Sequence, residues 1–286
     1  MDIGIIGIGC IGSSLARDFK ALGLGRVLLC DKNIEYLEQA EALGLGDGYF
    51  EHISDMARQC DVIFISVPVI HIADVLVKTA RHAKKGAILS DVGSVKASIV
   101  EAVTDRLPDH VCYIPGHPIT SDTAGSGPEA GRRGVFENAQ YLLTPLDETP
   151  LDALEALSSL LHQIGAETTI MDAHRHDVCL GFTSHLPHVI AFAMMNSSAK
   201  LSAELHEDVS KYAGGSFRDL TRVAQSDIAM WRDIFRVNKE HLKELCDLFV
   251  SEISMLQDLV ERDDTAGLEE FIKRAHDTRR RSLNNN

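Results

Sequence analysis

Histidines are concentrated in one short segment, and their spacing raises the question of what they bind. The sequence TSHLPHVIAF places His185 and His188 three residues apart, with Pro187 between them. Residues three apart share one face of a helix, and a proline begins or kinks a helix where it occurs. The pair could bind a metal together with His174 and His176, fill a core, or face a substrate. No carboxylate joins these histidines in a metal-binding motif such as HExxH, so we expect no metal site.

Three other stretches carry side chains that could do chemistry. DVGSVK contains Ser94 and ends a strand-like run, at the edge where parallel sheets bind ligands. PGHPIT holds His117 between a glycine and a proline. GGSFRDLTRVAQSDIAMWRDIF holds Arg218, Arg222 and the single tryptophan, Trp231. Each has a plainer alternative: a helix cap for Ser94, an ordinary loop histidine for His117, and a surface ion pair for Arg222.

A glycine-rich loop near the start of the chain predicts a dinucleotide site. In GIIGIGCIGSSL, Gly7, Gly9 and Gly12 form a G-x-G-x-x-G pattern that follows an apolar strand and opens a helix. The first glycine permits a tight turn, the second lets a pyrophosphate approach the backbone, and the third lets the helix pack closely. The pyrophosphate then meets the N–H groups at the helix start. The residues expected to contact the cofactor are Gly7, Gly9, Cys10, Ile11, Gly12, Asp31, Ser66 and Pro68.

Asp31 indicates which dinucleotide binds. It ends the second strand, about 20 residues beyond the glycine pattern, where an acidic residue accepts both ribose hydroxyls and repels a 2′-phosphate. Lys32 follows, but no arginine is adjacent. The sequence therefore favours NAD over NADP.

The elements that must position these residues differ between the two halves of the chain. In the first half, short apolar runs alternate with helical patterns, which predicts a doubly wound parallel α/β sheet of the Rossmann type. The expected strands are 2–6, 26–30, 62–66, 87–91, 111–114, 141–144 and 167–171. The expected helices are 13–22, 34–43, 70–81, 95–104 and 151–164.

After residue 172 the strand signals stop, and helices are expected at 176–201, 217–224, 229–261 and 265–275. Leu242, Leu245 and Phe249 begin an apolar face with helical spacing, suited to packing on a neighbour or on a partner subunit. The tail RRRSLNNN is predicted to be disordered. We expect a dinucleotide-binding domain at 1–172 and a helical substrate and dimerisation domain at 173–286, with the active site between them.

Composition excludes several classes of function. The net charge of −14 disfavours a nucleic-acid partner, since phosphates need clustered Lys and Arg. If the substrate is an anion, a few local cations must overcome this field. The six cysteines include no CxxC, which indicates reduced thiols in a cytoplasmic protein. We expect no signal peptide, because no basic segment precedes a long apolar run, and no membrane span.

Taken together, these motifs resemble one family. The order GxGxxG, DVGSVK, GHPI, SHLPH and GGSFRDLTRVAQSDIAMWRDIF is similar to that of the prephenate/arogenate (cyclohexadienyl) dehydrogenases of tyrosine biosynthesis, from the first strand to about Lys243. The resemblance implies an NAD(P)-binding domain followed by a helical domain that forms a homodimer. It also implies oxidation of a small cyclohexadiene substrate at its ring hydroxyl, with loss of CO₂ and formation of an aromatic ring.

The resemblance also implies roles for individual residues. His117 matches the family's catalytic histidine and would accept a hydrogen bond from the ring hydroxyl. Ser94 would orient His117 and the nicotinamide. Arg222 would hold the ring carboxylate with two parallel hydrogen bonds. The substrate-binding residues expected on this basis are Arg222, Arg218, His188 and His185.

One departure from the family pattern concerns substrate choice. After GHPI the chain reads TSDTAGSGPEAG and is about one residue longer than the family. An acid such as Asp122 in this loop would favour the ammonium group of arogenate over the keto group of prephenate. Two other readings stay open. One is a 3-hydroxyacid dehydrogenase, although residues 171–199 contain histidines and no lysine to serve as its catalytic residue. The other is a non-catalytic NAD-sensing module.

Overall fold

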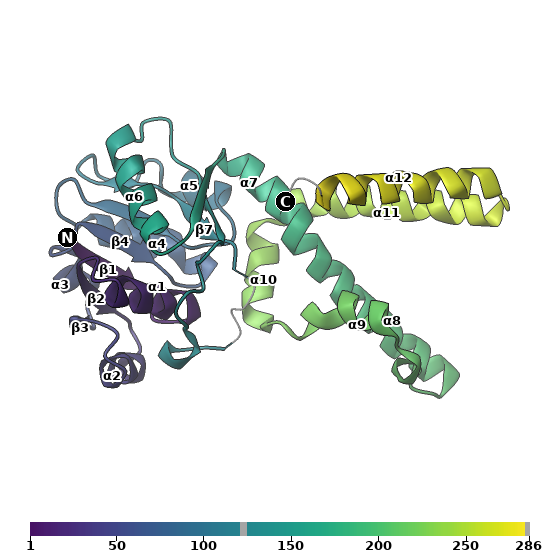
Figure 1. The fold of residues 1–286 in the computed structure, drawn as a ribbon, viewed down its shortest axis with the longest axis horizontal. Coiled ribbons are helices and arrows are strands. Elements are labelled where there is room, and N and C mark those ends of the chain that lie inside the picture. Colours follow the sequence, from purple (N-terminus) through teal and green to yellow (C-terminus); the bar gives the residue numbers. More distant parts are fainter. Residues whose placement is uncertain (121–124, 284–286) are drawn as a thin grey trace. The chain divides into compact units, whose positions relative to one another are not determined.

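The computed structural model describes residues 1–120 and 125–283 and contains the expected parallel sheet (Figure 1). Its strand order is β3-β2-β1-β4-β5-β6, all parallel, as in doubly wound nucleotide-binding folds. The strands are β1 (Asp2–Ile6), β2 (Arg26–Cys30), β3 (Gly48–Phe50), β4 (Val62–Ile65), β5 (Ile88–Asp91) and β6 (Cys112–Tyr113). The predicted fold class is confirmed, and the short strand β3 is an addition.

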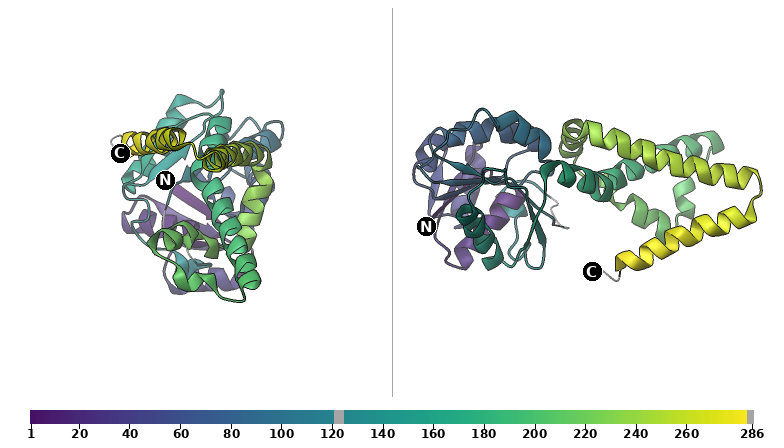
Figure 2. Two further views of the ribbon diagram at one scale, coloured as in Figure 1. Left: turned by 90° about the vertical axis from the view of Figure 1, so that its right-hand side faces the viewer. Right: turned by 90° about the horizontal axis from the view of Figure 1, so that it is seen from above.

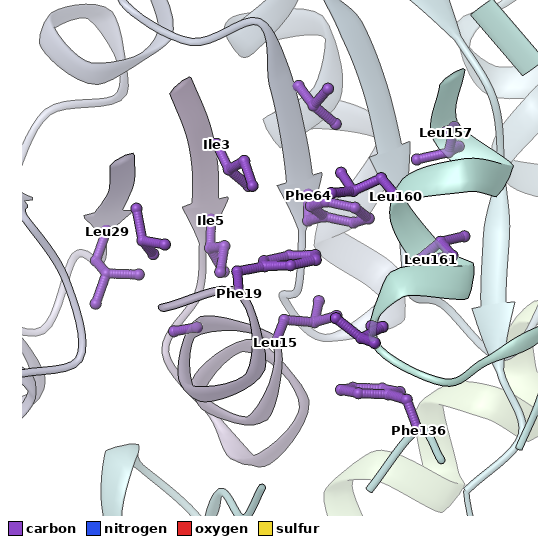
Figure 3. Close-up of a cluster of buried hydrophobic side chains, with 14 of the residues drawn as sticks. Ile3, Ile5, Leu15, Phe19, Leu29, Phe64, Phe136, Leu157, Leu160 and Leu161 are labelled. Carbon is purple, nitrogen blue, oxygen red and sulfur yellow. The ribbon is translucent and has the colours of Figure 1, made fainter. Parts of the chain in front are cut away.

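Helices cover both faces of this sheet because its strands are apolar on both sides. They are α1 (Cys10–Ala21), α2 (Ile34–Ala42), α3 (Ile53–Ala57), α4 (Val69–Ala80), α5 (Ala97–Val103) and α6 (Leu151–Gln163). Figure 3 shows one of the resulting cores, in which Ile5 of β1 and Phe64 of β4 meet Phe19 of α1 and Leu161 of α6. The rings of Phe19 and Phe64 lie 5.4 Å apart. This packing holds α1 against the sheet, and so it also holds the glycine loop that joins β1 to α1.

A second, smaller sheet was not expected as such. It contains β7 (Gly116–Pro118), β8 (Gln140–Leu143) and β9 (Glu167–Ile170), in that order. The strands predicted near 141 and 167 exist, but they pair here and not in the parallel sheet. Strand β7 is antiparallel to β8 and puts His117 opposite Leu142. His117 therefore lies on a strand, and the reading of an ordinary loop histidine is wrong.

The second half is helical, as predicted. Its elements up to residue 238 are α7 (Ala173–Leu180), the π-helical turn η2 (Gly181–His185), α8 (Leu186–Leu205), η3 (Val209–Tyr212), α9 (Gly215–Thr221), η4 (Arg222–Gln225) and α10 (Ile228–Val237). A π-helical turn is rare and occurs mostly at functional sites. Here it ends at His185, two residues before Pro187, which has no N–H to continue the α-helical pattern.

Two predictions about the last helices are wrong. The single helix expected over 229–261 is divided at Asn238, where α10 ends and α11 (Lys239–Glu261) begins. Asn238 is buried, and its side-chain amide bonds the backbone oxygen of Asp177 and Nδ1 of His185, so tertiary contacts override the local pattern. The tail is not disordered from Arg279, because α12 (Thr265–Leu283) continues through it; residues 284–286 lie outside the described part.

The chain forms two compact units, residues 1–238 and the chain from residue 239. Within the second unit, a short connection joins α11 to α12, and the two helices contact each other (Figure 2). The domain boundary expected after residue 172 stays a prediction.

The continuous helical run Ala173–Leu205 has the length and apolar composition of a membrane span, contrary to our expectation that no segment would. Only 28% of its most apolar 18-residue window is buried. Length and composition are weak grounds for a membrane span. A helix that packs on a partner subunit also exposes an apolar surface when one subunit is viewed without the other.

Candidate active site

The glycine loop has the geometry that a dinucleotide requires. Gly7 has a φ of +93°, and a Cβ there would lie 2.2 Å from the backbone oxygen of Ser66. A Cβ on Gly12 would lie 2.0 Å from the oxygen of Gly7, so only glycine fits at either position. Gly9 caps α1 without a side chain, and a Cβ there would meet nothing within 4 Å. The open space therefore lies in front of a helix N-terminus, where a pyrophosphate binds.

Asp31 is held beside this loop by the backbone. Its Oδ2 accepts a hydrogen bond from the N–H of Ile8 at 2.8 Å, and its Oδ1 accepts one from Asn33 at 2.9 Å. Each carboxylate oxygen keeps capacity for a second donor such as a ribose hydroxyl. Cys10 and Ile11 begin α1, and Ser66 and Pro68 follow β4. All the residues expected to contact the cofactor thus lie at the carboxyl edge of β1, β2 and β4, where the strand order reverses.

A buried ion pair joins the loop after β5 to strand β7. Lys96 and Asp91 are both fully buried and paired, and the Lys96 ammonium also donates to the backbone oxygen of Gly116 at 2.7 Å. The hydroxyl of Tyr113 donates to the other Asp91 oxygen at 2.8 Å. Burial lowers the pKa of Lys96, while the charge of Asp91 opposes that shift. Because Gly116 precedes His117, this pair fixes the start of the histidine's strand.

Ser94 lies in the loop tied down by Lys96 and does not cap the following helix. Helix α5 begins at Ala97, and Ser94 forms no cap. The carboxylate of Asp177 accepts instead from the N–H groups of Lys96 at 2.8 Å and Ala97 at 2.9 Å. The capping alternative for Ser94 is therefore wrong. A residue 80 positions away takes that role, which leaves the half-buried Ser94 with no such structural task.

His117 is half-buried and belongs to a row of polar side chains. Its Nδ1 lies 2.9 Å from Nε2 of His176, and Nδ1 of His176 lies 2.8 Å from Oδ1 of Asp177. Burial holds the pKa of His117 well below its usual range, and the neighbouring His176 and Lys96 add to the effect. His117 is therefore a neutral imidazole near pH 7, which can accept a hydrogen bond.

The two histidines of SHLPH both face Trp231. The ring of His188 stacks on the indole with centroids 3.4 Å apart, and the ring of His185 meets it edge-on at 6.0 Å. His188 also donates from Nδ1 to the oxygen of Ser184 at 2.9 Å. His185 is buried, and burial lowers its pKa to about 4. No group of three or more potential metal ligands occurs within residues 1–120 and 125–283.

Two buried N–H groups near this cluster have no hydrogen-bond partner among the described residues. Nδ1 of His185 accepts from the amide of Asn238 at 3.0 Å, so the hydrogen of this neutral ring is on Nε2, which has no partner in the described chain. The indole nitrogen of Trp231 also lacks one. A buried donor without a partner costs about 1–3 kcal/mol. Both groups are therefore available to a bound ligand.

Arg218 and Arg222 line a groove of about 840 Å³ together with Trp231 and Phe192. Neither arginine forms an ion pair with any side chain in the described ranges, so the surface ion-pair alternative for Arg222 is wrong. Asp219 also lines this groove. The groove offers guanidinium groups to an anion. Such local positive charges are needed at an anion-binding site because the chain as a whole is negatively charged.

Part of this arrangement has no distinctive sequence pattern. The sequence suggests His176 only as a metal ligand, and it does not single out Asp177 or Asn238. The local signal for His176 and Asp177 was a polar pair directly adjacent in AHRHDV, which is not distinctive. The loop residue Asp122 lies outside the described residues, so the structure says nothing of it.

Two family models match the chain: prephenate dehydrogenase, nucleotide-binding domain, over residues 15–170, and prephenate dehydrogenase, dimerization domain, over residues 172–274. A cyclohexadienyl dehydrogenase of Zymomonas mobilis is 36% identical over 278 residues, which are 97% of this chain and 94% of that protein.

Solved structures agree with these matches. The prephenate dehydrogenase of Aquifex aeolicus, in complex with hydroxyphenyl propionate and NAD⁺, superposes with a TM-score of 0.90 and 30% identity, covering 98% of both chains. The arogenate dehydrogenase of Synechocystis has a TM-score of 0.85 and 26% identity, covering 99% of this chain and 100% of that one.

Proposed function

Because the chain belongs to the prephenate dehydrogenase family, we propose how its residues carry out the oxidative decarboxylation of prephenate or arogenate. A nicotinamide held at the glycine loop would supply the hydride acceptor for the ring carbon that bears the hydroxyl. CO₂ leaves, and the ring becomes aromatic, giving 4-hydroxyphenylpyruvate from prephenate or tyrosine from arogenate. The observation that carries the proposal is the placement of His117, a neutral imidazole. Lys96 holds the start of its strand, and its ring is hydrogen-bonded to His176 of α7.

His117 accepts the proton of the ring hydroxyl as the hydride leaves. A neutral imidazole suits this task, because a protonated one could not accept, and general base catalysis of this kind contributes about 10²–10⁴-fold in rate. Ser94 orients His117 and the nicotinamide. The buried Lys96, two residues after Ser94, supports this assignment because it bonds the carbonyl directly before His117 and so holds the two segments together.

Arg222 binds the ring carboxylate of the substrate, and Arg218 contributes a second positive charge. Both arginines line the groove without an ion-pair partner in the described chain, so neither must give up a protein carboxylate to bind an anion. A guanidinium holds a carboxylate with two parallel hydrogen bonds. The unpartnered N–H of Trp231 and that of His185 supply further donors to an anionic substrate.

His188 lines the substrate pocket and binds the side chain of the substrate. The charge of Arg222 lowers the pKa of His188, in addition to the larger effect of burial, which indicates that the two groups are close. Stacking on Trp231 fixes the ring plane, and the bond to Ser184 fixes its Nδ1. The other ring nitrogen is then directed away from the backbone of its own helix.

NAD is the preferred cofactor. The chain binds a nicotinamide dinucleotide as a member of this family, and Asp31 supports NAD in particular. Its carboxylate is oriented by two backbone donors beside the glycine loop, where it accepts ribose hydroxyls and repels a 2′-phosphate.

The enzyme is a cytoplasmic homodimer in which residues 1–172 bind the dinucleotide and 173–286 provide substrate contacts and the subunit interface. The match to a dimerization domain over 172–274 supports the dimer. So do exposed apolar side chains on α8 and α11, which a partner would cover: Met194, Met195, Leu201, Leu205, Leu248, Val250, Ile253 and Met255. No disulfide links the six cysteines, all of which lie in the described part. Sedimentation of the purified protein would give its subunit number.

The absorbance of reduced nicotinamide tests the proposed reaction. The purified, metal-free protein is supplied with NAD or NADP and with prephenate or arogenate, in all combinations. We expect turnover with NAD and at least one substrate, and the ratio of specificity constants identifies the preferred one. Bound NAD without turnover in any combination would contradict the proposal and favour an NAD-sensing module.

A further inference from the structure

We propose that His176 and Asp177 are positioning residues that make Nε2 of His117 the hydrogen-bond acceptor facing the substrate. The inference rests on the proposed function, in which His117 takes the hydroxyl proton. It assigns a role to a buried pair that no part of the cofactor or substrate site uses directly. The argument depends on which atoms in the row from Asp177 to His117 can donate and which can only accept.

Asp177 is the fixed end of the row. It is buried, and its carboxylate accepts from the N–H groups of Lys96 at 2.8 Å and Ala97 at 2.9 Å. The amide of Asn238 donates to its backbone oxygen at 3.1 Å. Backbone N–H groups can only donate, so both carboxylate oxygens of Asp177 act as acceptors. Asp177 is therefore an acceptor whose position is set by two other elements of the fold.

The hydrogen positions on the two rings follow from this acceptor. A carboxylate cannot donate, so the hydrogen between Asp177 and His176 is on Nδ1 of His176. His176 is fully buried, and burial lowers its pKa, so the ring is neutral and its Nε2 carries no hydrogen. That nitrogen can only accept from Nδ1 of His117, 2.9 Å away. His117 is neutral as well, so its single hydrogen is on Nδ1, and Nε2 is the acceptor.

Proton transfer then runs in one direction. The O–H bond of the substrate breaks, its proton joins Nε2 of His117, and the ring becomes an imidazolium with a hydrogen on each nitrogen. The bond from Nδ1 to His176 strengthens, because its donor is now charged. Asp177 keeps its charge and takes no proton, as the buried carboxylate of a serine-protease triad does. Without His176, His117 could place its hydrogen on Nε2 and would then donate to the hydroxyl.

The surroundings of His117 explain why such support is needed. The charged and titratable groups that face it are Lys96, His176 and His185, and a positive charge on any of them disfavours a second one on the ring of His117. Asp91 is already paired with Lys96, and the carboxylate at the end of the hydrogen-bonded row from His117 is that of Asp177. Asp177 is therefore the group that can offset the charge formed on His117 during turnover.

The test compares three variants in the NAD-linked assay. His176→Phe removes the acceptor but keeps an apolar ring in the buried space, and we expect turnover to fall on the order of 10²-fold, with Michaelis constants nearly unchanged. The acidic limb of the pH profile should move to lower pH, because the imidazolium loses its support. His176→Gln can still accept through its side-chain oxygen and should stay within about tenfold of the wild type. His174→Phe, on the same helix but exposed, is the matched control.

Nitrogen-15 spectra of histidine-labelled protein give a readout that does not depend on turnover. With the His117 signals assigned from their loss in His117→Asn, Nε2 should show the shift of a ring nitrogen without a hydrogen in the wild type. A protonated Nε2 near pH 7.5 would overturn the inference, whether or not His176→Phe folds. A wild-type rate in His176→Phe would also overturn it, whereas a wild-type rate in His117→Asn would refute the proposed function itself.

Discussion

The glycine loop and the histidine cluster are built in opposite ways. At the loop, Gly7, Gly9 and Gly12 act through the space they leave and the backbone they expose, within one turn between a strand and a helix. At the cluster, His117 depends on side chains from other elements, namely His176 and, through its strand, Lys96. Cofactor binding is therefore a local property of the chain, whereas the chemistry depends on contacts between residues far apart in the sequence.

The two regions also differ in burial and charge. Asp31 at the loop is half-buried, whereas Asp91, Lys96, His176 and Asp177 at the cluster are all buried. Buried ion pairs contribute little net stability, because desolvation offsets their attraction. We infer that the cluster is retained for the position and the protonation state that it gives to His117. Changes at the loop should then affect cofactor affinity, and changes at the cluster should affect turnover.

The largest expected effect follows the replacement of His117. His117→Asn removes the proton acceptor, so turnover should fall about 10²–10⁴-fold, while NAD affinity stays nearly unchanged because the loop is untouched. Initial rates and a fluorescence titration with NAD measure the two quantities. The exposed His82 takes the same substitution as a control. Wild-type turnover in His117→Asn would exclude its catalytic role.

Arg222→Ala should act on substrate binding. Loss of the guanidinium should raise the Michaelis constant for the substrate by the equivalent of about 2–5 kcal/mol, with little change in that for NAD. Arg236→Ala removes a positive charge from α10 outside the groove and is the matched control. Equal Michaelis constants in Arg222→Ala and the wild type would show that the carboxylate is held elsewhere.

Acid should destabilise the cluster and not the loop. Burial lowers the pKa of His185 to about 4, against about 6.5 in an unfolded chain. Between these values the unfolded state binds a proton that the folded state does not. Stability is therefore fully present above about pH 6.5 and falls by up to about 3 kcal/mol as the pH falls to about 4. Urea unfolding at several pH values measures this, and His185→Gln should show a weaker dependence. Stability that rises toward pH 5 would contradict the burial of neutral histidines.

The smallest of these effects is expected at the loop. Asp31→Ala removes the acceptor for the ribose hydroxyls and should weaken NAD binding by about 1.5–3 kcal/mol, as for a hydrogen bond to a charged group. It should also improve the relative use of NADP, since the repulsion of a 2′-phosphate is lost. The ratio of specificity constants for the two cofactors is the readout. An unaltered ratio would remove the basis for the NAD preference.

The same contrast explains what could be read from the sequence. The glycine pattern, Asp31 and the alternation of strands and helices are local signals, and the fold that they predict is confirmed. The short strand β7 was missed because GHP has no apolar run, although it pairs with β8. The start of α5 was also misplaced, because its cap is Asp177, from 80 residues further along the chain.

The cluster was predictable only in part. His117 and Ser94 came from motifs and the family resemblance, as did Arg222 and the histidines of SHLPH. The partners His176 and Asp177 carry no distinctive spacing, and their importance appears only when α7 packs against α5 and β7. Likewise Asn238 lies inside an apparently continuous helical pattern, and its bonds to the distant residues Asp177 and His185 explain the break there.

A double-mutant cycle between Asp31→Ala and His117→Asn tests this division of labour most directly. The readout is kcat/KM for NAD at saturating substrate. Within residues 1–120 and 125–283 the two side chains share no hydrogen-bond partner, and independent sites add to within about 0.3–0.5 kcal/mol. We predict that the double variant loses the sum of the two single losses within that margin. A coupling energy above about 1 kcal/mol would contradict the account, because cofactor binding and proton transfer would then depend on each other.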